Sequence, residues 1–379
     1  MNAWEQRFCP EGEDDPVLLL NPGPINVSEG VARAQLRGDL CHREPEFFAV
    51  QRSIRDLLLQ AFAPQGGWTS VLVSGSGTAS LEAAVSSLIG PDEELLVLRN
   101  GVYGERIEAI AQAHGIPYHV LDQPWTAPQD PAALAKALDA HPRVGVVAGV
   151  VHETTTGLLN PIKDLGEVCR SRGKTFLVDA ISAIAGEELD LSWGVDAVVG
   201  TANKCIRGLP GMSFVLAREE LMAKAAAYPP RTLYLHLPAY HAKQEADSTP
   251  FTPAIQAAYA LEVALRELLA EGVGARVERM GHVAALLRRG CTELGLELYL
   301  DEAYLSRTIT TYRLPKGWSY EALHDALRAA GFVIYAGQGD LRQQAFRVCN
   351  MGVMSDADYE RFIDALKQAL VVGPVGASA

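Results

Sequence analysis

The sequence predicts an α/β fold: a large domain with a mostly parallel sheet and helices on both faces, plus a smaller α+β domain. Apolar runs such as FLVD (176–179) and VVAGVV (146–151) do not alternate with polar residues, which is typical of strands buried on both faces. Strand-like and helix-like segments alternate from about residue 69 to Lys204, as in doubly wound sheets. The chain has 379 residues, of which 48% are hydrophobic, and this length favours two cores.

Changes of pattern along the chain give the domain boundaries. Residues 1–16 are polar and acid-rich, and we expect an N-terminal arm there. The large domain is predicted over 17–262 and the small domain over 263–371, with a flexible tail at 372–379. A helix-like segment with Pro253 just inside its start connects the two domains.

Composition excludes several classes of partner. The net charge is −13 and the pI is about 5.2, which makes nucleic acid and anionic membrane surfaces poor partners. No apolar run approaches the roughly 18 residues of a membrane span. The six cysteines are scattered without paired spacing, so we expect free thiols in a reducing cytoplasm and no metal site.

Two residues at predicted strand ends indicate a specific cofactor. Asp179 ends one apolar run, and Lys204 follows the next one in the loop TANKCIRGLPG. The carboxyl ends of parallel strands are where open α/β sheets bind ligands. Pyridoxal phosphate needs both groups, because a lysine binds its aldehyde and a carboxylate keeps its pyridine nitrogen protonated. The simpler alternative is a helix-capping Asp and a solvated Lys.

Other candidate residues lie in the turns of the same region. The turn SGSGT (74–78) lies between a strand and a helix, and its small residues let backbone N–H groups approach a phosphate. Tyr103 follows the next strand, where its ring could stack on a planar cofactor or simply pack. The threonines at 154–156 end another strand and offer hydroxyls to a ligand or to the loop backbone.

Three arginines are candidate anion partners. Arg347 begins the strand-like segment FRVCNMG, Arg43 precedes a helix, and Arg231 lies in an irregular Pro-rich segment. A guanidinium can bind a carboxylate or a phosphonate through two parallel hydrogen bonds. Each arginine could equally be solvated on the surface.

These motifs, taken in order, resemble a known family. LLLNPGP, SGSGTASLEA, NGVYGERI, HETTTGLLNPI, VDAISAIAG, TANKCIRGLPG and AFRVCNMG are similar to the motifs of class V (fold-type I) pyridoxal-phosphate aminotransferases. The resemblance covers nearly the whole chain, from about Val17 to Leu370. HETTTGLLNP and ANKCI resemble most closely the branch that transfers the amino group of 2-aminoethylphosphonate to pyruvate.

The resemblance implies residue roles and an assembly. Lys204 falls on the lysine that binds pyridoxal phosphate covalently, and Asp179 on the partner of the pyridine nitrogen. Further positions fall on cofactor-binding residues of the family: Ser76, Gly77, Thr78, Tyr103, Thr154, Asn203 and Thr252. Arg347 falls on the substrate-anion arginine, with Arg43 as a second candidate. The family forms homodimers with active sites at the subunit interface, where Thr252 would reach the neighbouring subunit's cofactor.

The implied reaction converts 2-aminoethylphosphonate and pyruvate into phosphonoacetaldehyde and L-alanine, a step of phosphonate metabolism. An alternative is an aminotransferase of the same family that uses alanine or serine with glyoxylate, or another aminophosphonate. Ala183, Ile184 and Met212 depart from the pattern of the branch and leave the donor open. A desulfurase-type lyase would use the same cofactor, but it needs a mobile catalytic cysteine on a loop, and the cysteines near Lys204 do not indicate one. A nucleotide-binding dehydrogenase or a noncatalytic ligand-binding protein is a further alternative, but it does not account for the paired Asp179 and Lys204.

Overall fold

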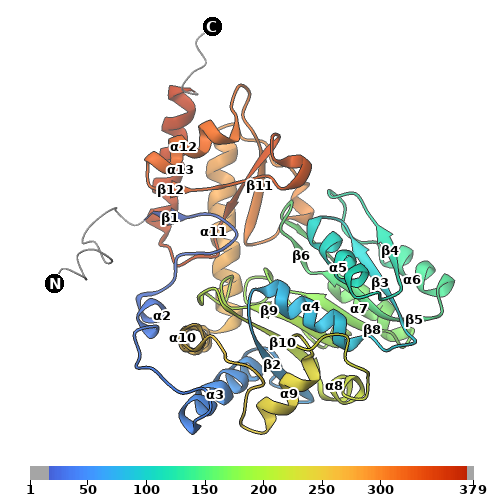
Figure 1. Ribbon diagram of the computed structural model, residues 1–379. Helices are drawn as coiled ribbons and strands as arrows, with labels where there is room; N and C mark the ends of the chain where they lie inside the picture. Colours follow the sequence, from blue (N-terminus) through green and yellow to red (C-terminus); the bar gives the residue numbers. More distant parts are fainter. Residues whose placement is uncertain (1–16, 374–379) are drawn as a thin grey trace.

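The computed structural model describes residues 17–373 and shows two units (Figure 1). The large unit is built around a central sheet, and the C-terminal unit lies above it in Figure 1 and contains the chain from residue 273 onward. The predicted arm (1–16) and residues 374–379 of the predicted tail lie outside the described residues. The predicted fold class, a large α/β unit followed by a smaller α+β unit, is confirmed.

The central sheet has seven strands in the order β2-β10-β9-β8-β5-β3-β4. Their bounds are β2 Trp68–Ser74, β3 Glu94–Arg99, β4 Tyr118–Asp122, β5 Val144–Val150, β8 Thr175–Asp179, β9 Ala197–Thr201 and β10 Met212–Arg218. The strand β10 runs antiparallel to both of its neighbours, β2 and β9, and all other neighbouring pairs are parallel. The other six strands therefore end at the same edge of the sheet.

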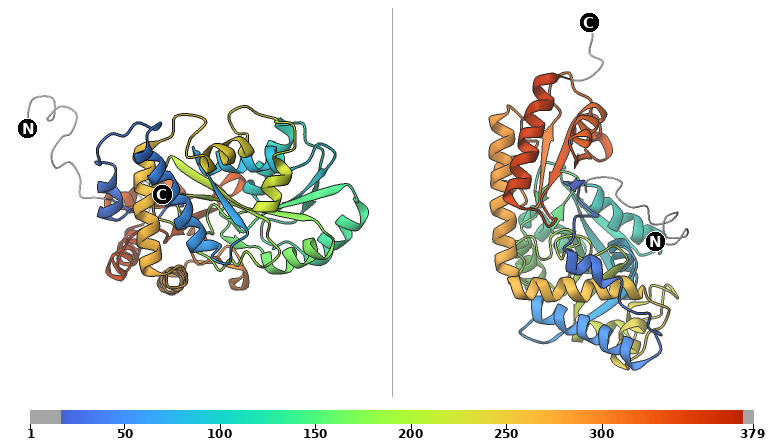
Figure 2. Two further views of the ribbon diagram at one scale, coloured as in Figure 1. Left: turned by 90° about the horizontal axis from the view of Figure 1, so that it is seen from below. Right: turned by 90° about the vertical axis from the view of Figure 1, so that its left-hand side faces the viewer.

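Helices cover both faces of this sheet, which is why its strands are apolar throughout (Figure 2). In β8, Leu177 packs on one face whereas Phe176 and Val178 pack on the other. The first face carries α4 Gly77–Leu88, α5 Val102–Ala113, α8 Glu219–Ala225 and α9 Leu237–Glu245. The second face carries α3 Pro45–Phe62, α6 Pro131–Ala140, α7 Ile162–Ser171 and α10 Ile255–Glu271, and α2 Glu29–Ala34 packs on α10.

The C-terminal unit contains a three-stranded antiparallel sheet in the order β11-β14-β13. Its elements are α11 Val273–Glu293, β11 Ile309–Arg313, α12 Tyr320–Ala329, β12 Phe332–Val333, β13 Tyr335–Ala336, β14 Ala345–Cys349 and α13 Asp356–Val372, with short 3-10 turns at Glu302–Tyr304 and Gly339–Leu341. The strand β1 Leu18–Leu19 pairs with β12, and Leu20 is buried in the same core. Residues 18–20 thus pack with the C-terminal unit, although chain order alone assigned them to the large domain.

The connection between the units is an elbow between α10 and α11. Gly272 ends one helix and precedes the other with a positive φ of 90°, a conformation that glycine adopts without strain. The helix α10 begins at Ile255, so Pro253 lies before the helix rather than inside it. From the elbow, α11 runs along the length of the C-terminal unit (Figure 2).

Candidate active site

The candidate site lies at the edge where the parallel strands end. Asp179 is the last residue of β8, and Lys204 lies three residues beyond the end of β9, its neighbour in the sheet. The short hairpin of β6 His152–Glu153 and β7 Leu158–Leu159 follows β5 at the same edge. The predicted juxtaposition of strand-end groups is therefore present in the fold.

Lys204 lies against the turn of residues 22–24. Its Nζ donates a hydrogen bond to the carbonyl oxygen of Pro22. A Cβ atom added to Gly23 would lie 3.1 Å from Lys204 Nζ, and Gly23 has a φ of +119°, so this position favours glycine. Burial lowers the pKa of the Lys204 amine below its ordinary value, which favours the neutral form.

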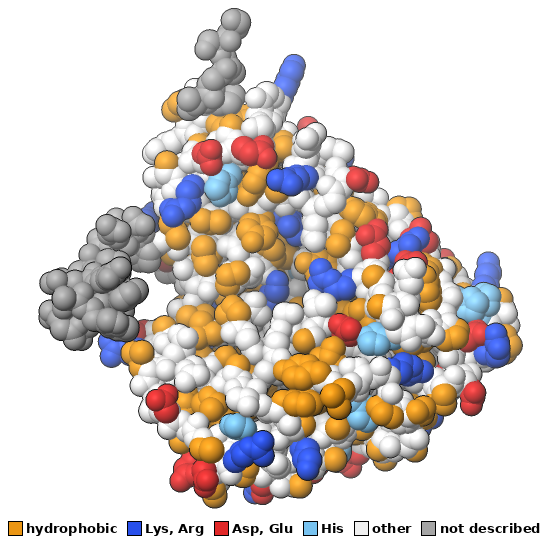
Figure 3. Space-filling view, viewed as in Figure 1, with side chains coloured by type: hydrophobic (Ala, Val, Ile, Leu, Met, Phe, Trp, Pro, Cys, Tyr) orange, Lys and Arg blue, Asp and Glu red, His pale blue; other side chains and the backbone are white. Residues whose placement is uncertain are grey.

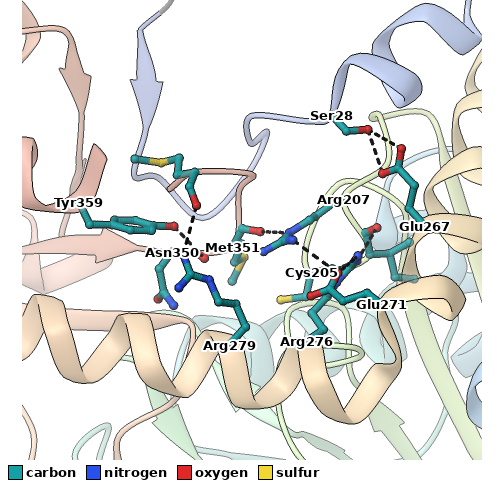
Figure 4. Close-up of polar contacts among 12 residues, drawn as sticks. Ser28, Cys205, Arg207, Glu267, Glu271, Arg276, Arg279, Asn350, Met351 and Tyr359 are labelled. Atoms are coloured by element: carbon teal, nitrogen blue, oxygen red, sulfur yellow. Dashed lines mark hydrogen bonds and ion pairs between the residues drawn. The ribbon is translucent and has the colours of Figure 1, made fainter. Parts of the chain in front are cut away.

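The loop that carries Lys204 is anchored by arginines that sequence reasoning did not identify (Figure 4). Arg276 of α11 is 2% exposed and donates from Nη1 to the carbonyl oxygens of Cys205 (3.1 Å) and Ile206 (3.2 Å). Arg207, within the loop, donates from Nε to the carbonyl oxygen of Met351 at 3.0 Å. Contacts with the C-terminal unit therefore hold the lysine loop in place.

Asp179 has one carboxylate oxygen without a partner. The residue is 3% exposed, and its Oδ1 accepts a hydrogen bond from the N–H of Ile181 at 2.9 Å. Its Oδ2 is buried and has no hydrogen-bond partner among residues 17–373. Burial raises the pKa of Asp179 to about 6, against the opposing effect of the nearby cations Arg106 and Lys204. A buried, unpaired carboxylate oxygen suits a protonated nitrogen on a ligand.

The predicted phosphate cradle lies at the N-terminus of α4. Ser76 is the N-cap residue and makes no capping hydrogen bond with its side chain. A Cβ atom on Gly77 would lie 2.7 Å from Ile181 Cδ1, so only glycine allows this close approach to the loop after Asp179. The first N–H groups of a helix lack partners within it, and together with the helix dipole they favour an anion.

Arg106 joins this cradle and was missed by sequence reasoning. It donates from Nη1 to Thr78 Oγ1 at 3.2 Å, and its guanidinium lies 4.5 Å from the centre of the Tyr103 ring. Tyr103 and Arg106 are three residues apart on α5 and so share one face of that helix. The i, i+3 spacing in NGVYGER was the available signal, but such pairs are common on any helix.

In the hairpin after β5, two adjacent residues differ in role: Glu153 is structural, whereas the hydroxyl of Thr154 has no partner within residues 17–373. Glu153 is fully buried and accepts hydrogen bonds from the N–H of Tyr103 (3.2 Å) and from Thr155 Oγ1 (2.5 Å). It therefore fixes the turn that carries Tyr103. Burial raises the pKa of Glu153 to about 7. The hydroxyl of Thr154 is buried and has no partner in the described part of the chain, as expected for a residue that binds a ligand.

Arg347 bridges the two units at the edge of the site. Its Nε donates to the carbonyl oxygen of Ala336 at 2.9 Å, and its Nη1 donates to that of Thr154 at 2.8 Å. It is 5% exposed and lines an open cavity of about 410 Å³ together with Tyr335 and Arg342. Figure 3 shows Lys and Arg side chains in the hollow between the units. This position is compatible with an anion-binding role.

The remaining predicted residues lie at the margins of the site. Asn203 accepts a hydrogen bond from Thr201 Oγ1 at 3.0 Å. Thr252 and Arg43 are exposed, and within residues 17–373 neither contacts Lys204 or Asp179 through a hydrogen bond. Arg231 donates to the carbonyl oxygens of Ser86, Ile89 and Gly90. It therefore caps the C-terminus of α4, the end opposite the cradle, and the interpretation of Arg231 as an anion partner was wrong.

The three residues that depart from the family pattern, Ala183, Ile184 and Met212, are all buried. Ala183 and Ile184 are buried in the core on the α10 side of the sheet, and Met212 is 2% exposed beside Ser74. In the part of the chain that the structure describes, no helix is long and apolar enough to cross a membrane. That part also contains no group of three or more His, Cys, Asp and Glu residues placed to hold a metal ion.

The fold and site together define an α/β enzyme of the aminotransferase kind, in which a lysine and an acid are presented from neighbouring strands. The family model "Aminotransferase class-V" matches residues 61–340, and the chain belongs to this family. It is 34% identical over 365 residues to the 2-aminoethylphosphonate–pyruvate transaminase of Syntrophobacter fumaroxidans, covering 94% of this chain and 97% of that one. It is 35% identical over 360 residues to the enzyme of the same name from Lysinibacillus sphaericus, covering 93% and 97%.

Solved structures of other aminotransferases have the same fold. Pyridoxamine–pyruvate aminotransferase from Mesorhizobium loti superposes with a TM-score of 0.87 at 30% identity, covering 95% of this chain and 93% of that one. Alanine–glyoxylate aminotransferase from Nostoc sp. gives a TM-score of 0.89 at 27% identity, covering 98% and 99%. A cysteine desulfurase from Thermococcus onnurineus shares the fold alone, with a TM-score of 0.74 at 14% identity over 94% and 95%. The similarity to aminotransferases supports the predicted class of enzyme.

Proposed function

We propose that this protein binds pyridoxal phosphate and transfers the amino group of 2-aminoethylphosphonate to pyruvate, giving phosphonoacetaldehyde and L-alanine. The observation that carries the cofactor assignment is the buried, unpaired Oδ2 of Asp179 beside the lysine loop of the neighbouring strand. The substrate assignment follows the curated relatives, which match over almost their full length at 34–35% identity.

The residues present fit this cofactor group by group. Lys204 would hold it covalently, and Asp179 would pair with its ring nitrogen. The cradle at Ser76, Gly77 and Thr78 would take its phosphate, while Tyr103 would stack on its ring. Four other residues would line the site: Arg106 beside the phosphate cradle, Thr154 through its free hydroxyl, Asn203 next to the lysine, and Thr252 from a partner subunit. When bound, the cofactor supplies a ring that accepts the electrons left on the substrate carbon.

Two side chains would perform the proton chemistry. Lys204 Nζ would take a proton from the substrate carbon, and its lowered pKa favours the neutral amine that this step needs. Asp179 stabilises the positive ring nitrogen and thereby the charge that develops in the transition state. The turn of residues 22–24 lies against Lys204 and limits where its amine can move.

Arg347 would bind the anionic group of each substrate in turn. Its Nε and Nη1 are already used by the carbonyls of Ala336 and Thr154, which fix the plane of the guanidinium. Its Nη2 makes no hydrogen bond to residues 17–373 and is left to donate to a phosphonate or carboxylate oxygen. Arg43 is proposed as a second anion partner, contributed across a subunit interface.

We also propose a cytoplasmic homodimer. Leu233 is 85% exposed and Tyr234 is 44% exposed, and large apolar side chains exposed in one segment favour contact with a second subunit. Thr252 follows Phe251, whose ring centre lies 4.8 Å from that of Tyr234, which agrees with a role at the neighbouring site. The cytoplasmic assignment rests on the sequence, whose six cysteines are scattered without paired spacing.

A half-reaction tests the proposal directly. The purified protein, loaded with pyridoxal phosphate, is mixed with 2-aminoethylphosphonate without an acceptor while the absorbance of the bound cofactor is followed. We expect rapid loss of that absorbance with 2-aminoethylphosphonate and with alanine, and its return on addition of pyruvate. Reaction with alanine or serine alone would move the donor to the alternative class and direct attention to Ala183, Ile184 and Met212.

A further inference from the structure

A second cavity lies away from the candidate active site. Its volume is about 350 Å³, and it is enclosed by the end of α3, the loop 184–193 and the first turns of α11. Its apolar lining includes Phe62, Leu191, Trp193 and Val277. Phe62 and Leu191 belong to the packing on the α10 side of the sheet, whereas the phosphate cradle lies on the α4 side. None of the residues proposed to bind the cofactor or the substrate anion lines this cavity, although Ile184, one of the departures from the family pattern, does.

The charged residues around the cavity are almost all acidic. Four carboxyl groups line it: Glu187, Glu188, Asp190 and Glu278. Arg307 is the one cation among the lining residues, and its guanidinium pairs with Glu188. A low-dielectric cleft lined by one sign of charge concentrates ions of the opposite sign. The cavity therefore favours a cation over an anion.

Glu187 provides an independent indication of a ligand. It is 3% exposed, and its Oε1 accepts a hydrogen bond from the N–H of Arg307 at 2.7 Å. Its Oε2 is buried and has no hydrogen-bond partner within residues 17–373. An unpaired buried carboxyl oxygen is costly unless a partner satisfies it, and a protonated amine is a suitable partner. Burial also raises the pKa of Glu187 to about 8, and a bound cation would reverse that effect.

We propose that this cavity binds a small organic cation, a protonated amine with an apolar body. The carboxyl groups hold the ammonium, and the aliphatic and aromatic side chains bury the apolar body. Trp193 and Phe62 are among the lining residues, and aromatic rings attract cations. The anionic substrates of the proposed reaction do not fit this chemistry, so the cavity is not a second site for them.

The cavity is connected to the lysine loop by direct packing. Gly186 precedes Glu187, and a Cβ atom on Gly186 would lie 2.4 Å from the Sγ of Cys205, the residue after Lys204. Thr308 Oγ1 lies 3.4 Å from both Glu187 Oε1 and His152 Nδ1. An occupant beside Glu187 therefore contacts a segment that packs against the cofactor lysine.

The test measures binding rather than transamination, so it is independent of the proposed function. N,N-dimethylbenzylamine, protonated at pH 7, is titrated into the full-length, cofactor-loaded protein by calorimetry. As a tertiary amine, this probe cannot form a covalent bond with the cofactor's aldehyde. We expect saturable binding at one site per chain, at least tenfold weaker binding of the neutral N,N-dimethylbenzamide, and none of phenylacetate. Equal affinity for the amine and the amide, or no binding of the amine, would overturn the proposal.

Two variants locate the binding site. Gly274 of α11 lines the cavity, and a Cβ atom there would meet no atom within 4 Å, so Gly274→Leu can place a bulky side chain at the cavity wall. We expect it to abolish binding, while the matched Gly274→Ala retains it. Glu187→Gln should weaken binding of the amine about tenfold. If this variant does not fold, the comparison of Gly274→Leu with Gly274→Ala still tests where the amine binds. Unchanged affinity in Gly274→Leu would place the amine elsewhere and refute the proposal.

Discussion

The substitution Arg276→Met tests whether the lysine loop depends on α11. Arg276 is 2% exposed, donates to the carbonyls of Cys205 and Ile206, and pairs with Glu271 through Nη2 at 2.5 Å (Figure 4). Methionine fills much of the same space but has no donor. The change therefore leaves two carbonyl groups without a donor and removes the nearer of the two arginines that pair with Glu271, the other being Arg207 at 3.8 Å.

The expected cost follows from these contacts. Hydrogen bonds to charged groups contribute about 1.5–3 kcal/mol each, and breaking a buried ion pair costs about 3–5 kcal/mol. Because the Glu271 side chain is 30% exposed and can regain water, we take the lower end, about 3 kcal/mol. With an unfolding entropy of about 2 cal/mol/K per residue, this corresponds to a fall of about 4 °C in Tm for 379 residues.

The matched control is Arg279→Met, one turn further along α11. Arg279 pairs with Asp356, but the two side chains are 34% and 44% exposed, so we expect a cost below about 1 kcal/mol. The assay compares Tm and the fraction of Lys204 that borohydride reduction labels with cofactor. Arg276→Met should lower both, and Arg279→Met neither by much. Equal behaviour of the two variants would refute the role of Arg276 in holding the loop.

Four further predictions concern the site itself. Lys204→Ala should abolish covalent labelling by borohydride, and mass spectrometry that finds the label on another lysine would contradict the assignment. Asp179→Ala should slow turnover roughly a hundred- to several-thousand-fold, if a loss of about 3–5 kcal/mol is felt fully in the transition state, and an unchanged rate would exclude the pairing with the ring nitrogen. Arg347→Ala should raise KM for both 2-aminoethylphosphonate and pyruvate, whereas an effect on one substrate alone would place the anion site elsewhere. Burial raises the pKa of Glu153 to about 7 and that of Glu187 to about 8, so their protonated forms stabilise the fold and this contribution is lost as pH rises through those values. The free energy of unfolding of the cofactor-free protein, measured by urea titration, should therefore fall between about pH 4.5 and pH 8, by at most about 1.4 kcal/mol per pH unit for each group, and Glu153→Gln should reduce the slope between about pH 4.5 and pH 7.

The sequence predicted the parts of the site that depend on local pattern. Asp179 and Lys204 follow strands that are apolar because both faces of the sheet are covered, and the edge at which they meet follows from parallel pairing. The small residues of the cradle were recognisable because glycine at position 77 allows a close backbone approach. Each of these features depends on a few consecutive residues, so it can be recognised in the sequence.

The contacts that hold the site together were not predictable in the same way. Arg276 reaches the lysine loop from a helix that begins after the elbow at Gly272, and nothing in the sequence of α11 distinguishes it from Arg279, which is half-exposed. Arg231 was misinterpreted for the same reason, since its role as a cap on α4 depends on where a Pro-rich segment returns to the helix. A hydrogen bond between residues far apart in the chain produces no periodic pattern in the sequence, so it could not be predicted.

The net charge of −13 likewise says little about either cavity, because charge is distributed locally. At the candidate active site, Arg106 and Lys204 act on Asp179, and Lys204 and Arg347 act on His152, whose pKa burial lowers to about 3. His152 is therefore neutral at physiological pH, and the guanidinium groups of Arg106 and Arg347 are the lasting positive charges of the site. The cavity beside Glu187 has the opposite sign. One chain would thus hold two clefts of opposite charge, one at the edge where the parallel strands end and one beside α11, which its overall acidity would not suggest.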